Sequence, residues 1–291
     1  MIFSGSAVAI VTPFDKNNEI DYFELKNLIE FQIANGIKAI VILGTTGESS
    51  TITNEERVKI IKFAACVIDK RIPLIVGTGS NSTATAIINS KTAEELGADA
   101  LLIVTPYYNK CNQNGLFLHY KAIAESVNIP IIVYNVPART GMNVSPETVY
   151  KLSKITNIIG IKEASGNLLQ IEKIINLVDD NFFVYSGDDG LTLPIIAMGG
   201  KGVISVTANV YPNEVSNLCE YALTNDYYNA RKLAIFLSKI NKTLFLDINP
   251  ICVKYYLNQI GFKVGKPRLP LTEPQSEIKK QIREVIKFYE N

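Results

Sequence analysis

Short runs of branched apolar residues alternate with longer amphipathic stretches along the whole chain. Each run is nearly continuous in Val, Ile, Leu and Ala, which is typical of parallel strands buried on both faces. The runs predict eight strands, at Ala7–Val11, Ala39–Leu43, Pro73–Gly77, Ala100–Thr105, Pro130–Asn135, Ile158–Glu163, Phe182–Ser186 and Gly202–Val206.

The stretches between the runs carry helix signals. Residues 21–35 place apolar side chains at helical spacing, and the segment from Thr53 to Glu56 forms a capping box. Ser145 followed by Pro146 puts a proline in the first turn of another helix. Strand, helix and strand repeat every 20–35 residues or so, a spacing that predicts right-handed βαβ units.

The eight units can form a closed barrel or an open doubly wound sheet. The GTGSNS segment of residues 77–82 has serine where a dinucleotide-binding turn needs its third glycine, and no Walker-type phosphate loop occurs. A barrel takes about 250 residues, which fits a chain of 291. We therefore predict an α/β fold, a (β/α)8 TIM barrel over residues 1–209.

Residues 210–291 read as helices that follow the barrel. The last of these helices has an apolar stripe at Ile278, Ile282, Val285, Ile286 and Tyr289. We expect these helices to pack on the barrel or on a neighbouring subunit. No low-complexity linker precedes them, so residues 1–291 are predicted to form a single domain.

Charge and composition exclude several classes of protein. The 29 basic and 28 acidic residues are interleaved and leave a net charge of +1, so neither nucleic acid nor an anionic membrane is indicated as a partner. The N-terminus lacks the pattern of a signal peptide, and no apolar run approaches the roughly 18 residues of a membrane span. The four cysteines are scattered without a CxxC pair, which indicates reduced thiols and a cytoplasmic protein.

The chain has one histidine, His119, in the amphipathic segment LFLHYKAIAE. We interpret it as an ordinary helix residue. A metal site built from several imidazole ligands cannot be supplied by this sequence, so we expect chemistry without a metal or another cofactor.

Polar residues collect where the predicted strands end. Strands two, four, five, six and seven end in GTTGE, TPYYN, YNVPARTG, KEAS and SGDD. The carboxyl ends of barrel strands meet on one face, where the active sites of such barrels lie. These segments therefore predict one site containing hydroxyls, an arginine and a lysine.

The lysine of strand six is the most informative residue. Alternation predicts one face with Ile158, Gly160, Lys162 and Ala164, and the other with Ile159, Ile161 and Glu163. A free lysine has a pKa of about 10.4, so only about 1 in 2,000 is neutral at pH 7. Desolvation, or a cation such as Arg139, would lower that pKa and make the amine a nucleophile. The residues alone equally allow a lysine that extends to solvent.

Four further residues allow two interpretations each. Tyr134 has the parity of Ile132 and can share the barrel mouth as a proton shuttle, or be a core tyrosine. Arg139 can present a planar fork to a carboxylate, or be a solvated loop residue. Thr45 and Thr46 can bind an anion in a glycine-flanked turn, or form a plain structural turn.

Taken together, the motifs GTTGES, VTPYYNK, YNVPARTG, GIKEASG, SGDD and GVISVTAN resemble, in this order, the dihydrodipicolinate synthase family. That family belongs to the pyruvate-dependent class I aldolases, with the N-acetylneuraminate lyases. The resemblance covers the whole chain. It implies a 4-hydroxy-tetrahydrodipicolinate synthase, which condenses pyruvate with L-aspartate 4-semialdehyde in the pathway to diaminopimelate and lysine.

The resemblance also implies roles for individual residues. Lys162 matches the Schiff-base lysine, and Tyr134 matches the tyrosine that relays protons. Thr46 matches the threonine that links Tyr134 to a second tyrosine, matched by Tyr108 and donated in the family by the adjacent subunit. The remaining implied roles are the pyruvate carboxylate site at Thr45 and Thr46, the semialdehyde carboxylate site at Arg139, and backbone positions lining the pocket at Gly187 and Ile204.

Several expectations follow from these assignments. A tyrosine working in trans implies a homo-oligomer with a dimer as the minimum active unit, and the family habit is a homotetramer. Lysine-inhibited relatives use a glutamate and a histidine where this chain has Thr85 and Arg57, so we expect weak or absent inhibition by lysine. The alternatives are a sister aldolase acting on N-acetylneuraminate or a 2-keto-3-deoxy acid, from which Thr45 and Arg139 separate this chain, and a non-catalytic ligand-binding barrel.

Overall fold

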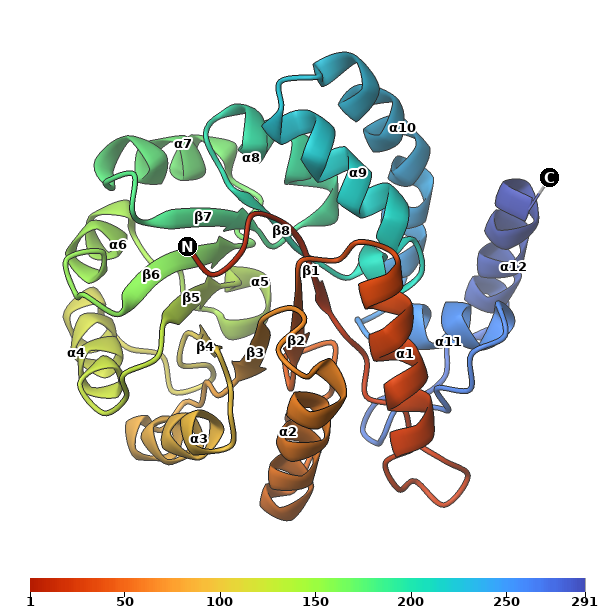
Figure 1. The fold of residues 1–291 in the computed structure, drawn as a ribbon, viewed down its shortest axis with the longest axis horizontal. Coiled ribbons are helices and arrows are strands. Elements are labelled where there is room, and N and C mark those ends of the chain that lie inside the picture. Colours follow the sequence, from red (N-terminus) through yellow and green to blue (C-terminus); the bar gives the residue numbers. More distant parts are fainter. Residues whose placement is uncertain (291) are drawn as a thin grey trace.

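Eight parallel strands form a closed barrel in the computed structural model, which describes residues 1–290 (Figure 1). The strands are β1 (Gly5–Ala9), β2 (Ala39–Ile42), β3 (Leu74–Gly77), β4 (Ala100–Val104), β5 (Ile131–Asn135), β6 (Ile158–Glu163), β7 (Phe183–Ser186) and β8 (Gly202–Ser205). They pair in chain order, and β1 also pairs with β8 to close the ring. The predicted (β/α)8 barrel is confirmed.

Helices follow the strands and surround the barrel (Figure 1). Those of the barrel are α1 (Tyr22–Ala34), α2 (Asn54–Ile68), α3 (Thr83–Glu95), α4 (Gln113–Ala124), α5 (Pro137–Thr140), α6 (Pro146–Leu152), α7 (Leu168–Leu177) and α8 (Thr192–Ala197), with the 3-10 turns η1 (Asp189–Leu191) and η2 (Thr207–Asn209). The predicted helix starts are confirmed. Asp21 caps α1, Thr53 and Glu56 form the reciprocal capping box of α2, and Pro146 opens α6 after the cap Ser145.

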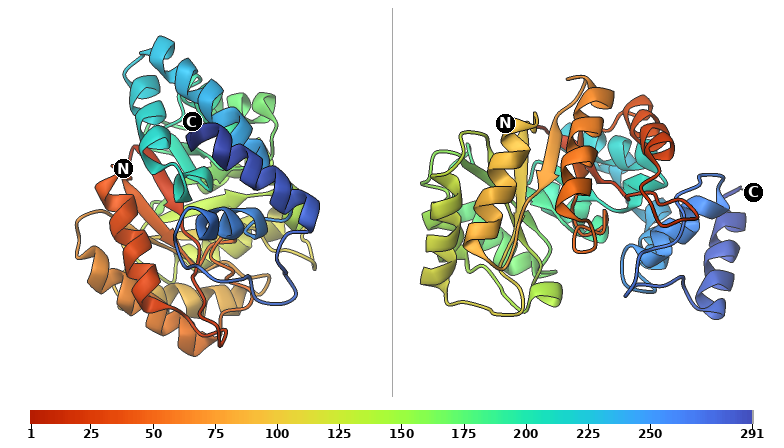
Figure 2. Two further views of the ribbon diagram at one scale, coloured as in Figure 1. Left: turned by 90° about the vertical axis from the view of Figure 1, so that its right-hand side faces the viewer. Right: turned by 90° about the horizontal axis from the view of Figure 1, so that it is seen from below.

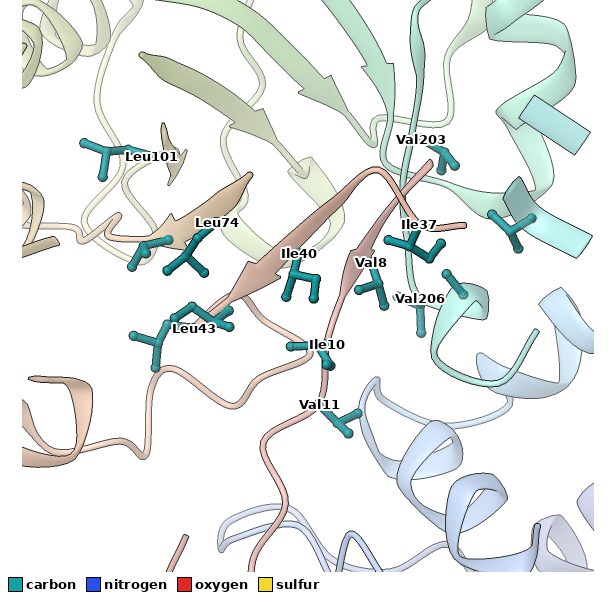
Figure 3. Close-up of a cluster of buried hydrophobic side chains, with 14 of the residues drawn as sticks. Val8, Ile10, Val11, Ile37, Ile40, Leu43, Leu74, Leu101, Val203 and Val206 are labelled. Atoms are coloured by element: carbon teal, nitrogen blue, oxygen red, sulfur yellow. The ribbon is translucent and has the colours of Figure 1, made fainter. Parts of the chain in front are cut away.

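The barrel strands separate two hydrophobic layers. Along β1, Ala7 and Ala9 face the barrel interior, whereas Val8 packs in the outer layer beneath the helices. Figure 3 shows this outer layer, with Val8 beside Ile40 of β2. Side chains of both layers are excluded from water, which explains why the strands read as continuous apolar runs rather than as alternating ones.

The largest shift of a strand boundary is at β1, which ends at Ala9 rather than at Val11 as predicted. The backbone N–H of Ile10 still donates to the carbonyl of Val41, at 3.0 Å. The N–H of Val11, however, donates to Oδ1 of Asn209, at 3.1 Å. A side chain 198 positions away in the sequence therefore takes this N–H where the strand pairing ends, and the local pattern carries no sign of it.

The predicted alternation along β6 is wrong at its first two residues. Ile131 of β5 pairs with Ile158, but Ile132 pairs with Gly160, so β6 has one extra residue at this point. This bulge places Ile158 in the outer layer and turns Ile159 toward the interior cluster. From Gly160 onward the alternation holds, so the lysine two residues later still faces the barrel interior.

The C-terminal extension consists of α9 (Pro212–Leu223), α10 (Tyr227–Leu244), α11 (Ile251–Gln259) and α12 (Ser276–Glu290). Helix α9 packs beside β1 and β8, and α12 packs against α10 and α11, at one side of the molecule (Figures 1 and 2). Ile282, Val285 and Ile286 of the predicted stripe are buried in that contact. Among residues 1–290, none of the helices combines the length and the apolar character that crossing a membrane requires.

Candidate active site

A cavity of about 590 Å³ opens at the carboxyl ends of the barrel strands. The residues predicted for the site supply much of its wall, and α10 supplies part of its outer side. The residues that line it include Thr45, Thr46, Tyr134, Arg139, Lys162, Gly187, Asp189 and Asn249. Five of the six motifs on which the family resemblance rests therefore contribute residues to one cavity, and VTPYYNK contributes none.

Lys162 lies at the base of this cavity, near the end of β6. Its side chain is only 4% exposed, and within residues 1–290 it makes no hydrogen bond or ion pair. It pairs in register with Tyr134 of β5, and its Nζ lies 4.4 Å from the centroid of the Tyr134 ring. The predicted approach of these two side chains is thus found in the structure.

Burial lowers the pKa of Lys162 to about 8, because the charged ammonium loses its water. The negative charge of Asp189 opposes this change, and the positive charge of Arg139 adds to it. With a pKa of about 8, about one amine in ten is neutral at pH 7, compared with about one in 2,000 for a free lysine. The environment therefore favours the nucleophilic form of the amine.

Tyr134 is buried beside this amine, and burial raises the pKa of its hydroxyl. Arg139 and a hydrogen bond with the Thr45 side chain partly oppose that rise. The phenol consequently keeps its proton at neutral pH. A protonated hydroxyl next to a neutral amine can donate to an oxygen that develops negative charge.

The two threonines of the turn after β2 have different partners. Thr45 is the residue that interacts with the Tyr134 hydroxyl. Thr46 instead accepts a hydrogen bond from Nδ2 of Asn249, at 2.9 Å. The resemblance assigns the link with Tyr134 to Thr46, and that role stays a prediction.

Arg139 and Gly187 border the cavity from two other strand ends. Arg139 lies in the short helix α5, and its Nη2 donates to the backbone carbonyl of Asn249, at 3.0 Å. A side chain at Gly187 would place its Cβ 2.7 Å from Cβ of Ala164 and 3.1 Å from Cε of Lys162. A larger residue would clash with Ala164 and would also press on the lysine side chain.

The cavity of one chain does not include two of the predicted site residues. Tyr108 is 91% exposed and lies outside the cavity, with a left-handed backbone at φ 71°. Ile204 is buried in the barrel interior rather than among the lining residues. A contribution of Tyr108 to this site would need a second chain.

Two residues that line the cavity, Asp189 and Asn249, were not predicted from the sequence. Asp189 is a half-buried carboxylate that accepts hydrogen bonds from the Val206 and Thr207 N–H groups, at 2.9 and 3.1 Å, and from the Ser205 hydroxyl. Burial raises its pKa, while these donors oppose the rise. Asp189 stood within the SGDD motif and could have been singled out. Asn249 lies in the C-terminal extension, far from every strand end, and carried no signal.

His119 and Arg57, which lie outside the motifs, each make a hydrogen-bonding contact in the structure. His119 is a buried residue of α4 whose Nδ1 lies 2.9 Å from the Thr83 hydroxyl, and burial lowers its pKa to about 4. It is the ordinary helix residue that was predicted. Arg57 donates to the Gly77 carbonyl at 3.0 Å, and the weak response to lysine stays a prediction. Within the described part of the chain, no three His, Cys, Asp or Glu side chains are grouped to hold a metal ion.

Known proteins match this chain along its whole length. The profile of the Dihydrodipicolinate synthetase family matches residues 2–289. A 4-hydroxy-tetrahydrodipicolinate synthase of Acetivibrio thermocellus is 48% identical over 288 residues, 99% of this chain and 98% of the relative. One of Citrifermentans bemidjiense is 52% identical over 270 residues, 93% of each.

The solved structures agree with the sequence relatives. The crystal structure of dihydrodipicolinate synthase from Aquifex aeolicus superposes with a TM-score of 0.97 at 47% identity, covering 99% of this chain and 98% of that one. These relatives favour the synthase interpretation over the sister aldolase and the non-catalytic barrel. The chain belongs to the dihydrodipicolinate synthase family.

Proposed function

We propose that this protein condenses pyruvate with L-aspartate 4-semialdehyde through a Schiff base on Lys162, as a 4-hydroxy-tetrahydrodipicolinate synthase. The observation that carries the proposal is a buried lysine without a hydrogen-bonding partner in residues 1–290, facing a cavity of about 590 Å³ beside the hydroxyl-bearing Tyr134. A lysine in that position has no structural task that would require its charge.

The first half of the reaction forms the covalent intermediate. Neutral Lys162 attacks the keto carbon of pyruvate, and the Tyr134 hydroxyl donates a proton to the oxygen that leaves as water. The product is a protonated imine, whose positive nitrogen draws electrons from the neighbouring methyl group. Loss of a methyl proton then gives an enamine. The hydroxyls of Thr45 and Thr46 hold the pyruvate carboxylate during these steps.

The second half forms the carbon–carbon bond. The enamine carbon attacks the aldehyde of the semialdehyde, and the aldehyde oxygen takes up a proton. The substrate's own amine then attacks the imine carbon, displaces Lys162 and closes a six-membered ring. Arg139 binds the semialdehyde carboxylate with its planar fork. Gly187 and Ile204 line or support the pocket, and no step needs a metal or an organic cofactor.

The remaining proposals concern the assembly and its place in the cell. Tyr108 is 91% exposed, as expected for a side chain that completes the proton relay of a neighbouring subunit. We therefore propose a homo-oligomer with a dimer as the minimum unit, and a homotetramer as its resting form. We further propose that residues 1–291 act as one domain and that the enzyme works in the cytoplasm.

The test is reduction with borohydride in the presence of pyruvate, followed by peptide mass mapping. A pyruvyl adduct is expected on Lys162 and on no other lysine. Steady-state assays should then show condensation with aspartate semialdehyde, compared side by side with N-acetylneuraminate and 2-keto-3-deoxy acids. An adduct on another lysine, or none, would refute the mechanism, and a preference for a sugar acid would favour the sister aldolase.

A further inference from the structure

The C-terminal extension reaches the cavity through Asn249. This residue lies two positions before α11, is 5% exposed and lines the cavity, although it is 203 positions from Thr46 in sequence. None of the strand-end motifs contains it. The barrel by itself therefore does not complete the wall of the site.

Asn249 contacts both groups proposed to hold substrate carboxylates. Its side-chain Nδ2 donates to Oγ1 of Thr46 at 2.9 Å. Its backbone carbonyl accepts a hydrogen bond from Nη2 of Arg139 at 3.0 Å. The threonine that would hold pyruvate and the arginine that would hold the semialdehyde thus meet at one residue.

The side-chain contact fixes the direction of a hydroxyl group. A threonine hydroxyl has one proton to give, and it can also accept hydrogen bonds. Because Asn249 is the donor in this pair, the Thr46 proton is left free to bind an anion in the cavity. Oδ1 of Asn249 is buried and has no partner within residues 1–290. A buried acceptor without a partner costs free energy. If Asn249 served stability alone, we would expect its Oδ1 to have a hydrogen-bond donor.

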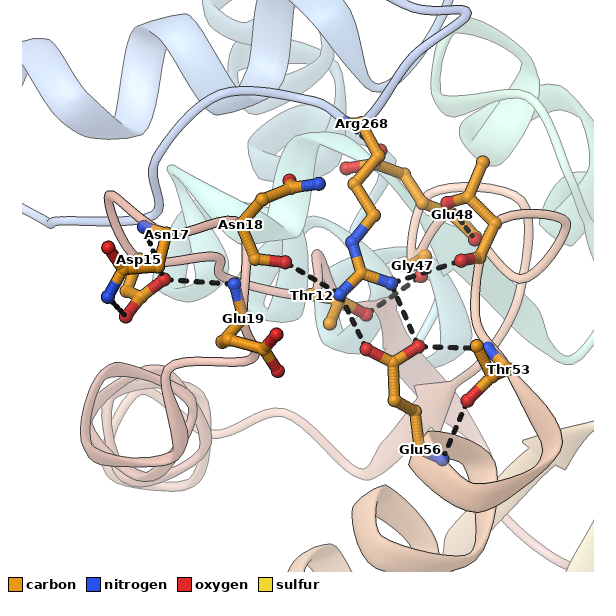
Figure 4. A network of polar contacts seen from close by, with 11 residues as sticks. Thr12, Asp15, Asn17, Asn18, Glu19, Gly47, Glu48, Thr53, Glu56 and Arg268 are labelled. Carbon is orange, nitrogen blue, oxygen red and sulfur yellow. Dashed lines mark hydrogen bonds and ion pairs between the residues drawn. The ribbon is translucent and has the colours of Figure 1, made fainter.

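A second set of contacts holds Asn249 in place relative to the threonine turn. Glu48 closes the turn, and its two carboxylate oxygens accept from Nζ of Lys254 and from the backbone N–H of Arg268, each at 2.8 Å. Arg268 also binds Glu56, as Figure 4 shows beside Glu48 and Gly47. The C-terminal extension is therefore anchored to the same turn on which Asn249 acts.

We propose that Asn249 is a positioning residue that directs the Thr46 hydroxyl toward the pyruvate carboxylate and holds the Arg139 fork for the semialdehyde carboxylate. This inference rests on the proposed function. It assigns the two contacts of Asn249 to different substrates, since the side chain acts on Thr46 and the backbone carbonyl acts on Arg139.

Two substitutions at Asn249 test the proposal, one that removes only the side-chain contact and one that disturbs both anion sites. Asn249→Ala removes the donor to Thr46 but keeps the carbonyl that binds Arg139, so we expect the KM for pyruvate to rise about 10-fold or more, with the KM for the semialdehyde within about threefold. Asn249→Asp accepts the Thr46 proton and adds a negative charge beside both anion sites. It should raise both KM values about 10- to 100-fold. In both variants kcat should change less than KM.

Asn258→Ala provides the matched control. Asn258 lies in α11 and donates to the Gly265 carbonyl at 2.9 Å. Its substitution therefore removes a similar hydrogen bond from the C-terminal extension, at a position away from the cavity. Thermal unfolding of all variants reports any general loss of structure. The inference is overturned if Asn249→Ala lowers Tm as Asn258→Ala does while both KM values stay at the wild-type level. It is also overturned if Asn249→Ala raises both KM values equally.

The rate of borohydride trapping with pyruvate alone keeps this inference apart from the proposed function. If wild-type enzyme forms no adduct on Lys162, the proposed function fails. If wild type forms the adduct and Asn249→Ala forms it with the same pyruvate dependence, only the positioning role of Asn249 fails. A variant that does not fold is replaced by Asn249→Ser, whose short hydroxyl is also expected to lose the contact with Thr46.

Discussion

Two lysines are buried in the part of the chain that the structure describes, and they differ in what surrounds the amine. Lys162 at the barrel mouth is 4% exposed, and Lys254 of α11 is 0% exposed. Burial lowers the pKa of each to about 8. Neither the extent of burial nor the pKa distinguishes the proposed nucleophile from the other lysine.

The partners of the amine distinguish them. Nζ of Lys254 donates to Glu48 at 2.8 Å and to the backbone carbonyls of Thr12 and Lys266 at 3.0 and 3.1 Å. The ring of Phe14 lies 4.1 Å from the same nitrogen. Three acceptors occupy its three protons, so the ammonium is held charged by its contacts and closed to any ligand.

Lys162 has none of these acceptors in residues 1–290, and a cavity stands in front of it. The comparison teaches that a depressed pKa marks burial, whereas reactivity needs an amine that is both unpaired and accessible. One lysine fastens the C-terminal extension to the threonine turn. The other is kept free by the barrel.

The largest expected effect is on catalysis. Lys162→Ala should lower kcat by about 10⁴-fold or more, because the covalent route is lost. In the Lys254→Met variant, the molecules that fold should still form the pyruvyl adduct on Lys162. Steady-state kinetics and mass mapping of both variants check this contrast. Condensation at wild-type speed by Lys162→Ala would remove the distinction between the two lysines.

The next effect is on stability. Lys254→Ala should lower the free energy of unfolding by about 3–5 kcal/mol, since it leaves the Glu48 carboxylate buried without its cation. The double substitution Lys254→Met with Glu48→Leu should recover part of that loss. Urea denaturation at one fixed protein concentration measures both. A loss below about 1 kcal/mol for Lys254→Ala would show that the pair does not anchor the extension.

The smallest expected effect is an increase in the free energy of unfolding. Burial lowers the pKa of Lys162 from 10.5 to about 8. At about 1.4 kcal/mol per pKa unit, this shift corresponds to about 3 kcal/mol. That free energy opposes folding at any pH at which Lys162 is charged in the unfolded chain. Lys162→Met should therefore stabilise the fold by about 1–3 kcal/mol at pH 7. This gain is full below pH 8 and fades as the pH rises through 10.5, above which the lysine is neutral in both states.

Denaturation of Lys162→Met and wild type at pH 7, 9 and 10.5 tests this dependence. The difference between the two proteins isolates Lys162, because the other titrating groups are common to both. Equal stability at pH 7 would mean that the buried amine has a partner which offsets its desolvation, and the contrast with Lys254 would disappear.

Much of the fold followed from local patterns. Apolar periodicity predicted the eight strands, and capping residues predicted the helix starts at Asp21, Thr53 and Pro146. Both signals depend only on residues a few positions apart. The faces of β6 were predicted correctly only from Gly160 onward. A bulge set by pairing with β5 changes the parity before that point, and pairing partners are not a local property.

Parts of the site followed from the sequence in the same way. Lys162, Tyr134, Thr45, Thr46 and Arg139 were found because they lie at strand ends, which a barrel must bring to one face, whereas Gly187 was named through the resemblance to a family. Tyr108 and Ile204 could be named only through the resemblance to a family. The structure of one chain leaves both outside the lining of the cavity.

By itself, then, the sequence determined the eight-stranded barrel and the polar rim, since both depend on short-range periodicity and on the geometry of parallel strands. Only the tertiary structure decided which buried lysine is free and that Asn249 lines the site. These outcomes depend on contacts between positions up to about two hundred residues apart. The free energy of such contacts depends on burial and distance in space, and a linear pattern contains neither.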